Sequence, residues 1–358
     1  MKSFAFLTGV LVVFSVQAFC FGYYDSITNG TLVPGLSPLQ AALGSVRAVG
    51  TCEPVSIFLN PAQTAFLPLS LQLSGSSIQW SESVSESDVE KATRTMMSND
   101  NGTAAFVWRA GTLAIGAGIA KVAEFGYEGT HVVSADSDYL QQSLAILTSN
   151  GSQWEMLGSV SAIVSGYLSA GFSGGVRTAA ADYSYSFTSQ EFGIPDSSAE
   201  WSFEETEFAW HAGLALNGEM FKSGVSYSSG TSRMEDIIAL GGSALAPHIN
   251  NTTVGFEAEV TSPFDSNRFM GKLFVKMPLT GDLNAVTSVS FDDNRVADRA
   301  GLGFGLGFDF RINRLSVGGS VLNRFKARRN TAFPDEQSDR VDDSATEFVF
   351  GIAYMLGD

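Results

Sequence analysis

The chain has 358 residues, with 37 Asp and Glu against 21 Lys and Arg, a formal net charge of −16 and only 16% charged residues. Soluble domains carry about 25% charged residues, so this composition disfavours an ordinary cytosolic or a disordered protein. The acidic balance disfavours a nucleic-acid binder, which needs a basic face. The two cysteines cannot form a disulfide framework or a four-thiolate zinc site.

The first 22 residues are predicted to be an export signal. Lys2 supplies the charged start, residues 4–16 are mostly apolar, and Val16-Gln17-Ala18 is a small-residue cleavage site. Cleavage after Ala18 or after Gly22 fits this pattern. The alternative is an uncleaved anchor, but the apolar run is shorter than the roughly 20 residues that a spanning helix needs. No later stretch has 18 uninterrupted apolar residues, which excludes a bundle of transmembrane helices.

Residues 23–65 differ from everything that follows them. They are rich in small residues, as in Ala41-Ala42-Leu43-Gly44, and they lack a long alternation of apolar and polar positions. We therefore predict a separate N-terminal segment here, followed by the main structural unit over residues 66–358.

The main unit is dominated by alternation with a period of two, the pattern of β-strands. In residues 302–310, Leu and Phe occupy one face, and the opposite face is Gly303, Gly305, Gly307 and Asp309. Residues 208–216, 254–260 and 348–356 repeat this arrangement, and residues 269–277 do so except at Phe274. Large apolar groups opposite small or charged groups are typical of a strand between lipid and a crowded, wet lumen. An exported β-sandwich is the alternative.

A transmembrane β-barrel is the fold class that these strands predict. With about 10 residues a strand plus turns and loops, a hairpin takes roughly 40 residues, which predicts about 14 antiparallel strands, with 12 or 16 as the nearest alternatives. We expect tight turns at 217–218, 280–282 and 312–314, and long polar loops at the following residues: 81–102, 128–153, 188–202, 228–251, 292–300 and 326–345. Helical patterns at 86–97 and 137–147 predict short helices within two of these loops.

Catalysis is not expected. His131, His211 and His248 are far apart and have no metal-ligand spacing, so we predict no metal site and no cofactor. His211 falls among the small and polar residues of its strand, which favours a hydrogen-bonding role in the lumen. Residues 171–175 match Gly-x-Ser-x-Gly, but no helical pattern follows them as a nucleophile elbow requires, and a strand or turn is the better interpretation.

Two motifs near the N-terminus carry a resemblance. Arg47-Ala48-Val49-Gly50 is followed about ten residues later by Asn60-Pro61-Ala62, after a signal and before the barrel strands. In this the chain resembles the FadL and PorV superfamily of bacterial outer-membrane proteins. The resemblance implies a barrel of 14 strands whose N-terminal segment plugs the lumen, with Arg47, Gly50, Asn60, Pro61 and Ala62 as the plug motif.

The resemblance also implies a function. In the fatty-acid transporter branch, hydrophobic small molecules such as long-chain fatty acids are captured at the outer surface and leave sideways through the barrel wall. Candidates for the capture surface are Tyr139, Leu140, Leu144 and Leu147. Expected partners are these ligands, outer-membrane lipid and the barrel-assembly machinery, and no nucleic acid is expected. The alternatives are a PorV-like partner or shuttle in a protein-secretion complex with surface attachment, and a general diffusion porin.

Overall fold

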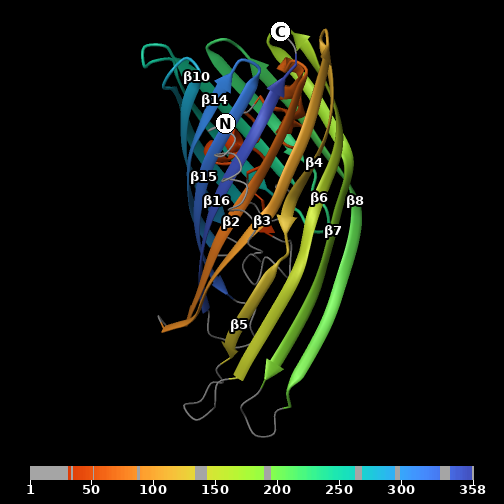
Figure 1. The fold of residues 1–358 in the computed structure, drawn as a ribbon, viewed down its shortest axis with the longest axis vertical. Coiled ribbons are helices and arrows are strands. Elements are labelled where there is room, and N and C mark those ends of the chain that lie inside the picture. The colour runs from red at the N-terminus through yellow and green to blue at the C-terminus, as the bar shows by residue number, and fades with distance from the viewer. Residues whose placement is uncertain are drawn as a thin grey trace, which may run out of the picture.

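Antiparallel strands with alternating side chains close into a barrel in the computed structural model (Figure 1). The structure describes residues 31–33, 35–50, 52–86, 89–133, 143–188, 195–262, 268–294, 299–330 and 339–356. The predicted signal, residues 1–22, and Tyr139 and Leu140 lie outside the described residues. The strands are β1 (Thr31–Leu32), β2 (Ser70–Glu86), β3 (Val89–Ala110), β4 (Leu113–Glu124), β5 (Tyr127–Val133), β6 (Ser143–Ser165), β7 (Leu168–Thr188), β8 (Ser197–Asn217), β9 (Phe221–Ser228), β10 (Ile237–Ala246), β11 (Thr252–Thr261), β12 (Arg268–Pro278), β13 (Leu283–Asn294), β14 (Arg299–Ile312), β15 (Leu315–Asn330) and β16 (Asp339–Met355).

The wall is an antiparallel ring of 14 positions. Neighbouring strands pair in sequence order from β6 to β16, β16 pairs with β2, and β4 pairs with β6, which closes the ring. β5 continues the position of β4 along the same neighbour, β6, so the two strands count as one. The predicted all-β fold with about 14 antiparallel strands is confirmed.

Large apolar side chains face outward and small ones face inward. On β14, Leu306 is 64% exposed, whereas Gly305 between the outward residues is buried. This follows the predicted pattern, because only the outward face meets hydrocarbon in a barrel of this kind. Phe274, which interrupts the alternation on β12, points inward and is 2% exposed, with its ring over Gly255 and Gly50.

Tight connections gather at one end of the barrel, at the top of Figure 1, and we call this the short-turn end. The predicted turns at 280–282 and 312–314 are confirmed, since β13 and β15 begin directly after them. Asn217 ends β8, and three residues precede β9, so this connection is one residue longer than the expected two-residue turn. Gly111 and Gly166 begin two further tight connections, which were not predicted from the sequence.

The predicted loops are wrong over much of their length because the strands continue through them. Strand occupies parts of every stretch assigned to a loop: 81–86 and 89–102, 128–133 and 143–153, 188 with 197–202, 237–246, 292–294 with 299–300, and 326–330 with 339–345. β6 has 23 residues, about twice the length needed to span a membrane. Beyond the lipid both faces of a strand can be polar, so the alternation that identifies the spanning part disappears.

The two predicted helices are also wrong where the structure describes them. Residues 86 and 89–97 form the tip of the β2–β3 hairpin, with Glu86 paired to Val89. Residues 143–147 belong to β6, and the rest of the second predicted helix lies outside the described residues. Cross-strand pairing overrode a weak local helical pattern in both places.

The lumen holds an N-terminal stretch that we call the inner segment, the described part of residues 33–67. It contains α3 (Pro38–Ala42) and two 3-10 helices, η1 (Pro54–Phe58) and η2 (Pro61–Phe66). α3 contacts β13 to β16, whereas η2 contacts β6, β7 and β8 on another side of the ring. The segment therefore crosses the lumen, as Figure 1 shows in red and orange. No helix among the described residues is long and apolar enough to span a membrane.

Candidate functional site

Asn60 joins the two sequence motifs of the inner segment. Its side chain is fully buried, and Nδ2 donates to the Ala48 carbonyl at 2.9 Å and to the Leu214 carbonyl of β8 at 3.1 Å. Its Oδ1 accepts from the Ala62 amide at 3.2 Å and caps η2. Asn60 thus fixes the start of η2, the 47–50 turn and the wall together.

Two glycines of the wall allow the inner segment to pack this closely against it. A Cβ at Gly171 would lie 2.4 Å from the Ala62 nitrogen, and a Cβ at Gly213 would lie 2.0 Å from the Asn60 Oδ1 atom. Any side chain at either position would therefore push the inner segment away from the wall. Pro61, at the first position of η2, is buried in the same contact.

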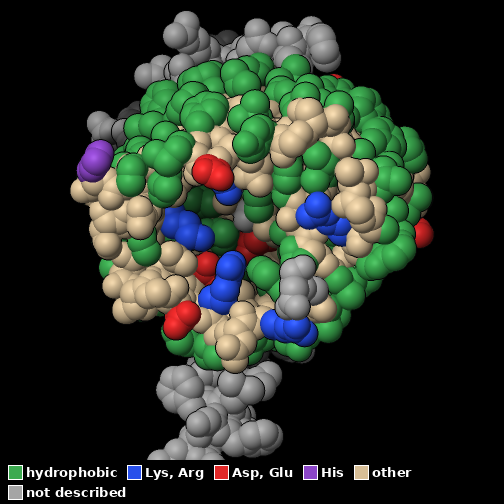
Figure 2. Space-filling view, turned by 90° about the horizontal axis from the view of Figure 1, so that it is seen from above, with side chains coloured by type: hydrophobic (Ala, Val, Ile, Leu, Met, Phe, Trp, Pro, Cys, Tyr) green, Lys and Arg blue, Asp and Glu red, His purple; other side chains and the backbone are tan. Residues whose placement is uncertain are grey.

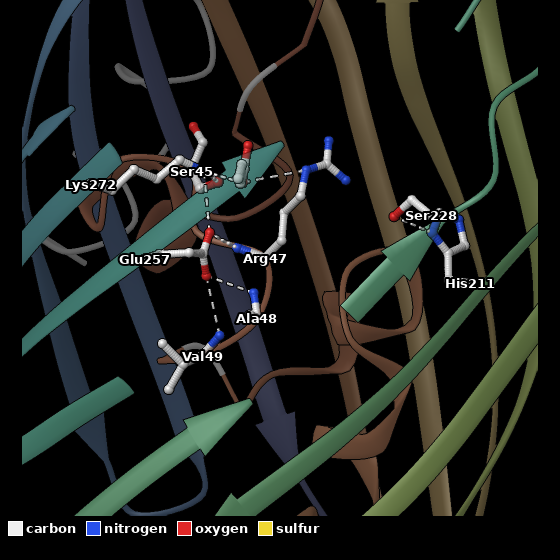
Figure 3. Close-up of polar contacts among 9 residues, drawn as sticks. Ser45, Arg47, Ala48, Val49, His211, Ser228, Glu257 and Lys272 are labelled. Carbon is white, nitrogen blue, oxygen red and sulfur yellow. Dashed lines mark hydrogen bonds and ion pairs between the residues drawn. The ribbon is translucent and has the colours of Figure 1, made fainter. Parts of the chain in front are cut away.

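A carboxylate on β11 holds the other motif. Glu257 Oε1 accepts from the Arg47 amide at 2.7 Å, and Oε2 accepts from the Ala48 amide at 2.6 Å (Figure 3). Lys272 on β12 donates to the Ser45 carbonyl at 2.6 Å and lies 3.3 Å from Glu257 Oε1. We call Glu257 with the 47–49 amides the latch. Gly50 follows it with φ +106°, which lets the chain turn back toward η1.

His211 lies in a second buried polar network, on the opposite side of the close-up (Figure 3). Its Nε2 atom is 2.9 Å from Glu155 Oε1 on β6, and its Nδ1 atom is 2.8 Å from Ser228 Oγ. Arg177 on β7 donates to the same Glu155 oxygen at 2.9 Å. The predicted placement of His211 inside the lumen is confirmed. The network ties β6, β7, β8 and β9 together, and Leu36 and Phe58 of the inner segment line a cavity of about 30 Å³ beside it.

The wall is interrupted where β4 passes into β5. β3 pairs with β4 only as far as Ala120, and β5 pairs with β6 alone among the described residues. Phe125 and Gly126 separate the two strands, and β1 pairs with the freed edge of β4 at Ala123 and Glu124. The ladder between β3 and the β4–β5 position therefore stops partway along the barrel. Lipid cannot satisfy an open strand edge, and here β1 covers the end of β4, whereas the edge of β5 turned away from β6 has no paired strand among the described residues.

A row of aromatic rings leads to this interruption, and we call it the aromatic track: Trp201, Tyr183, Phe203 and Phe125. The Trp201 and Tyr183 rings stack at 5.0 Å and 4°, Tyr183 and Phe203 lie 6.1 Å apart, and Phe203 meets Phe125 edge to face at 5.2 Å. Trp201 is 45% exposed, whereas Phe125 is fully buried. The track thus runs from the surface of the long β6–β8 extension, low in Figure 1, to the interruption.

The predicted capture residues are only partly described. Leu147 is 2% exposed and packs with Phe125 and Tyr127 beside the track. Leu144 lies on β6, and Tyr139 and Leu140 are outside the described residues. The roles assigned to these four side chains stay predictions. The track itself could not be predicted from the sequence, because its rings come from β7, β8 and the β4–β5 connection and no local pattern relates them.

The described residues contain no group of three or more His, Cys, Asp and Glu side chains arranged to hold a metal ion. Ser173 of the Gly-x-Ser-x-Gly match lies within β7 and donates to the Ile57 carbonyl at 2.7 Å, so its interpretation as a strand residue is confirmed.

Glu53 of the inner segment is expected to make the stability of the folded protein depend on pH. Burial raises the pKa of its carboxyl to about 7, against the hydrogen bond from Ser37 Oγ at 2.5 Å. Because this pKa lies above the unfolded value of 4.5, the contribution of Glu53 to stability is complete below about pH 4.5 and is lost as the pH rises through about 7.

We therefore expect Glu53→Gln to stabilise the protein at about pH 8.5 by about 1 to 3 kcal/mol and to have little effect at about pH 4. Unfolding of the detergent-solubilised protein at both pH values measures this difference. Glu204→Gln, on the exposed face of β8, is the control. An equal effect of Glu53→Gln at both pH values would contradict the prediction.

Solved structures share this fold. The chain matches the crystal structure of a Pseudomonas aeruginosa FadL homologue with a TM-score of 0.62 and 13% identity, over 91% of this chain and 99% of that one. It matches the Pseudomonas putida toluene transporter TodX with a TM-score of 0.65 and 11% identity, over 91% and 100%. It matches the CymD monoaromatic hydrocarbon channel with a TM-score of 0.61 and 11% identity, over 92% and 99%. No protein-family model and no curated protein matches the sequence. The resemblance to the FadL group is thus confirmed at the level of the fold.

Proposed function

We propose that the protein is a channel of the bacterial outer membrane that admits hydrophobic small molecules and releases them sideways through its wall. The observation that carries this proposal is the meeting of the aromatic track with the interrupted ladder at Phe125. Apolar side chains that are 36% to 65% exposed cover the outward face, which fits a wall in contact with lipid. The shared fold with the FadL homologue and TodX supports the same role.

Sideways release is the favourable route for an apolar solute. A molecule that moves from Phe125 through the wall passes from protein to hydrocarbon without re-entering water, so it keeps the roughly 25 cal/mol for each Å² of apolar surface already buried. Straight passage down the lumen would instead meet the inner segment, in which Ala41, Val46 and Ala48 are fully buried.

The chemistry of the track favours neutral, flat solutes over fatty-acid anions. Stacked rings attract another aromatic ring beyond simple burial, by about 0.5 to 1.5 kcal/mol. Glu205 lies beside Phe203 and forms an ion pair with Arg233 at 3.1 Å, and the Arg233 guanidinium already covers the Phe203 ring at 3.7 Å. That cation is therefore occupied, and the adjacent carboxylate repels a carboxylate ligand.

The experiment is an uptake assay with radiolabelled toluene and a long-chain fatty acid in a host that lacks its own transporters. Phe203→Ala should lower toluene uptake about tenfold, the equivalent of about 1.4 kcal/mol. Trp210→Ala is the matched control, since Trp210 lies on the same strand but packs against Phe172 and Tyr227. Equal loss in both variants, or none in Phe203→Ala, would refute the role of the track.

The two alternatives predict different results. A general diffusion porin needs an open, polar lumen, and the buried inner segment disfavours it. A PorV-like role in secretion would leave uptake of both probes at background while export of cargo depends on the gene.

A further inference from the structure

A cavity of about 280 Å³ opens at the short-turn end of the barrel, far from the aromatic track. Figure 2 looks onto this end and shows a hollow in which basic and acidic side chains gather inside a ring of apolar ones. We call this cavity the vestibule. Its lining is drawn from both the inner segment and the wall: Leu39, Leu43, Gly50, Cys52, Glu53, Pro54, Leu67, Ser70, Lys222, Ser243, Thr253, Phe274, Lys276, Asp309, Arg311, Ser316, Ala353 and Met355.

Three cations reach the vestibule from three strands. Lys222 lies on β9, Lys276 on β12 and Arg311 on β14, each at an inward position. Neither Lys222 nor Arg311 has an ion-pair partner among the residues that the structure describes. In a chain with a net charge of −16, basic side chains clustered around a cavity and left unpaired mark a place for an anion from outside the chain.

The acidic groups of the vestibule are already engaged. Asp309 accepts from Ser316 Oγ at 2.5 Å and lies 3.5 Å from Lys276 Nζ. The Glu53 carboxyl accepts from Ser37 Oγ in a partly buried hydrogen bond, and desolvation raises the pKa of this carboxyl, which favours its protonated form. Cations thus exceed carboxylates in the vestibule even before the state of Glu53 is considered.

The floor of the vestibule is apolar. Leu39 and Leu43 of the inner segment pack with Phe274 of the wall, and Leu67 and Met355 extend this surface. A ligand that contacts both the cations and the apolar floor of the vestibule must carry a single anionic group on an apolar body. The volume limits the body to about the size of a small aromatic or short aliphatic group, at the lower end of ordinary ligand pockets.

We propose that the vestibule binds a small amphipathic anion, with its anionic group attracted by the positive charges of Lys222 and Arg311 and its apolar body on Leu39, Leu43 and Phe274. The cations belong to the wall, whereas the two leucines belong to the inner segment, so the ligand bridges the two. Because it binds only when the inner segment is docked, it stabilises the docked state by a free energy that rises with the logarithm of its concentration above the dissociation constant. This site is independent of the hydrophobic route, since it lies at the other end of the lumen and selects an anion instead of a neutral solute.

Three probes of nearly equal size and different charge test the proposal: benzoate, benzyl alcohol and benzylamine. Ligand-observed NMR titration of the full-length protein in a zwitterionic detergent measures the affinity for each. We expect saturable benzoate binding, at least tenfold tighter than that of benzylamine. The double variant Lys222→Gln with Arg311→Gln should weaken benzoate about tenfold and leave benzyl alcohol unchanged.

Arg109→Gln is the matched control, because Arg109 lies at the same end of the barrel, does not line the vestibule, and donates to the Gly111 carbonyl at 2.9 Å. Benzoate binding that is absent, or equal in the native and double-variant proteins, would overturn the proposal. Phe203→Ala separates the two hypotheses, since loss of toluene uptake with intact benzoate binding concerns the track alone. Phenylphosphonate in place of benzoate then shows whether carboxylates or phosphates are preferred.

Discussion

Replacing Glu257 by alanine is expected to make the barrel leak small polar solutes. The buried amides of Ala48 and Val49 and the partly buried amide of Arg47 lose their acceptor, and each buried unsatisfied donor costs about 1 to 3 kcal/mol. A total loss of about 3 kcal/mol would raise the undocked population of the inner segment about 100-fold. Lys272 keeps Glu259 as an ion-pair partner, so the effect falls mainly on the latch.

Swelling of proteoliposomes in a sugar solution measures this leak. The native barrel should swell slowly, and Glu257→Ala should swell much faster. Glu204→Ala, which removes a carboxylate on the exposed face of β8, should match the native rate. If Glu257→Ala stays as slow as the native protein while still folding, as a heat-modifiable gel band would show, the latch does not control the docking of the inner segment.

Adding a single methyl group at Gly171 is expected to have an effect of comparable size from the other side of the lumen. The new Cβ would lie 2.4 Å from the Ala62 nitrogen, a backbone atom that cannot turn aside. Overpacking of this kind costs about 1 to 3 kcal/mol, and here the relief comes from moving η2 off the wall. We therefore expect Gly171→Ala to raise the swelling rate and to lower the temperature at which the barrel unfolds.

Gly158→Ala on the neighbouring strand β6 is the control. A Cβ at that position would have its nearest neighbour at 4.0 Å, so the methyl group fits without displacement. The two variants make the same chemical change in adjacent strands and differ only in what faces them. Equal unfolding temperatures and swelling rates for the pair would show that η2 is not seated as closely as the structure places it.

The residues of the plug motif could be identified from the sequence, but their contacts with the wall could not. The spacing of Arg47-Ala48-Val49-Gly50 and Asn60-Pro61-Ala62 carried the resemblance that implies a plug, and the structure adds a contact between the two motifs, in which Asn60 donates to the Ala48 carbonyl. Their wall partners, Glu257, Gly171 and Gly213, carry no signal in their own strands, since glycine and glutamate are ordinary inward residues of a barrel.

By itself, the sequence determined the class of fold. Leu and Phe alternate with Gly along residues 302–310 because lipid contacts one face of a spanning strand, and that pattern is local and can be read without knowing the neighbours. The tertiary structure alone decided where the wall is interrupted, which rings form the aromatic track, and which cations share the vestibule. Each of these features joins residues from strands far apart in the chain, and ring closure, which no short stretch of sequence encodes, brings them together.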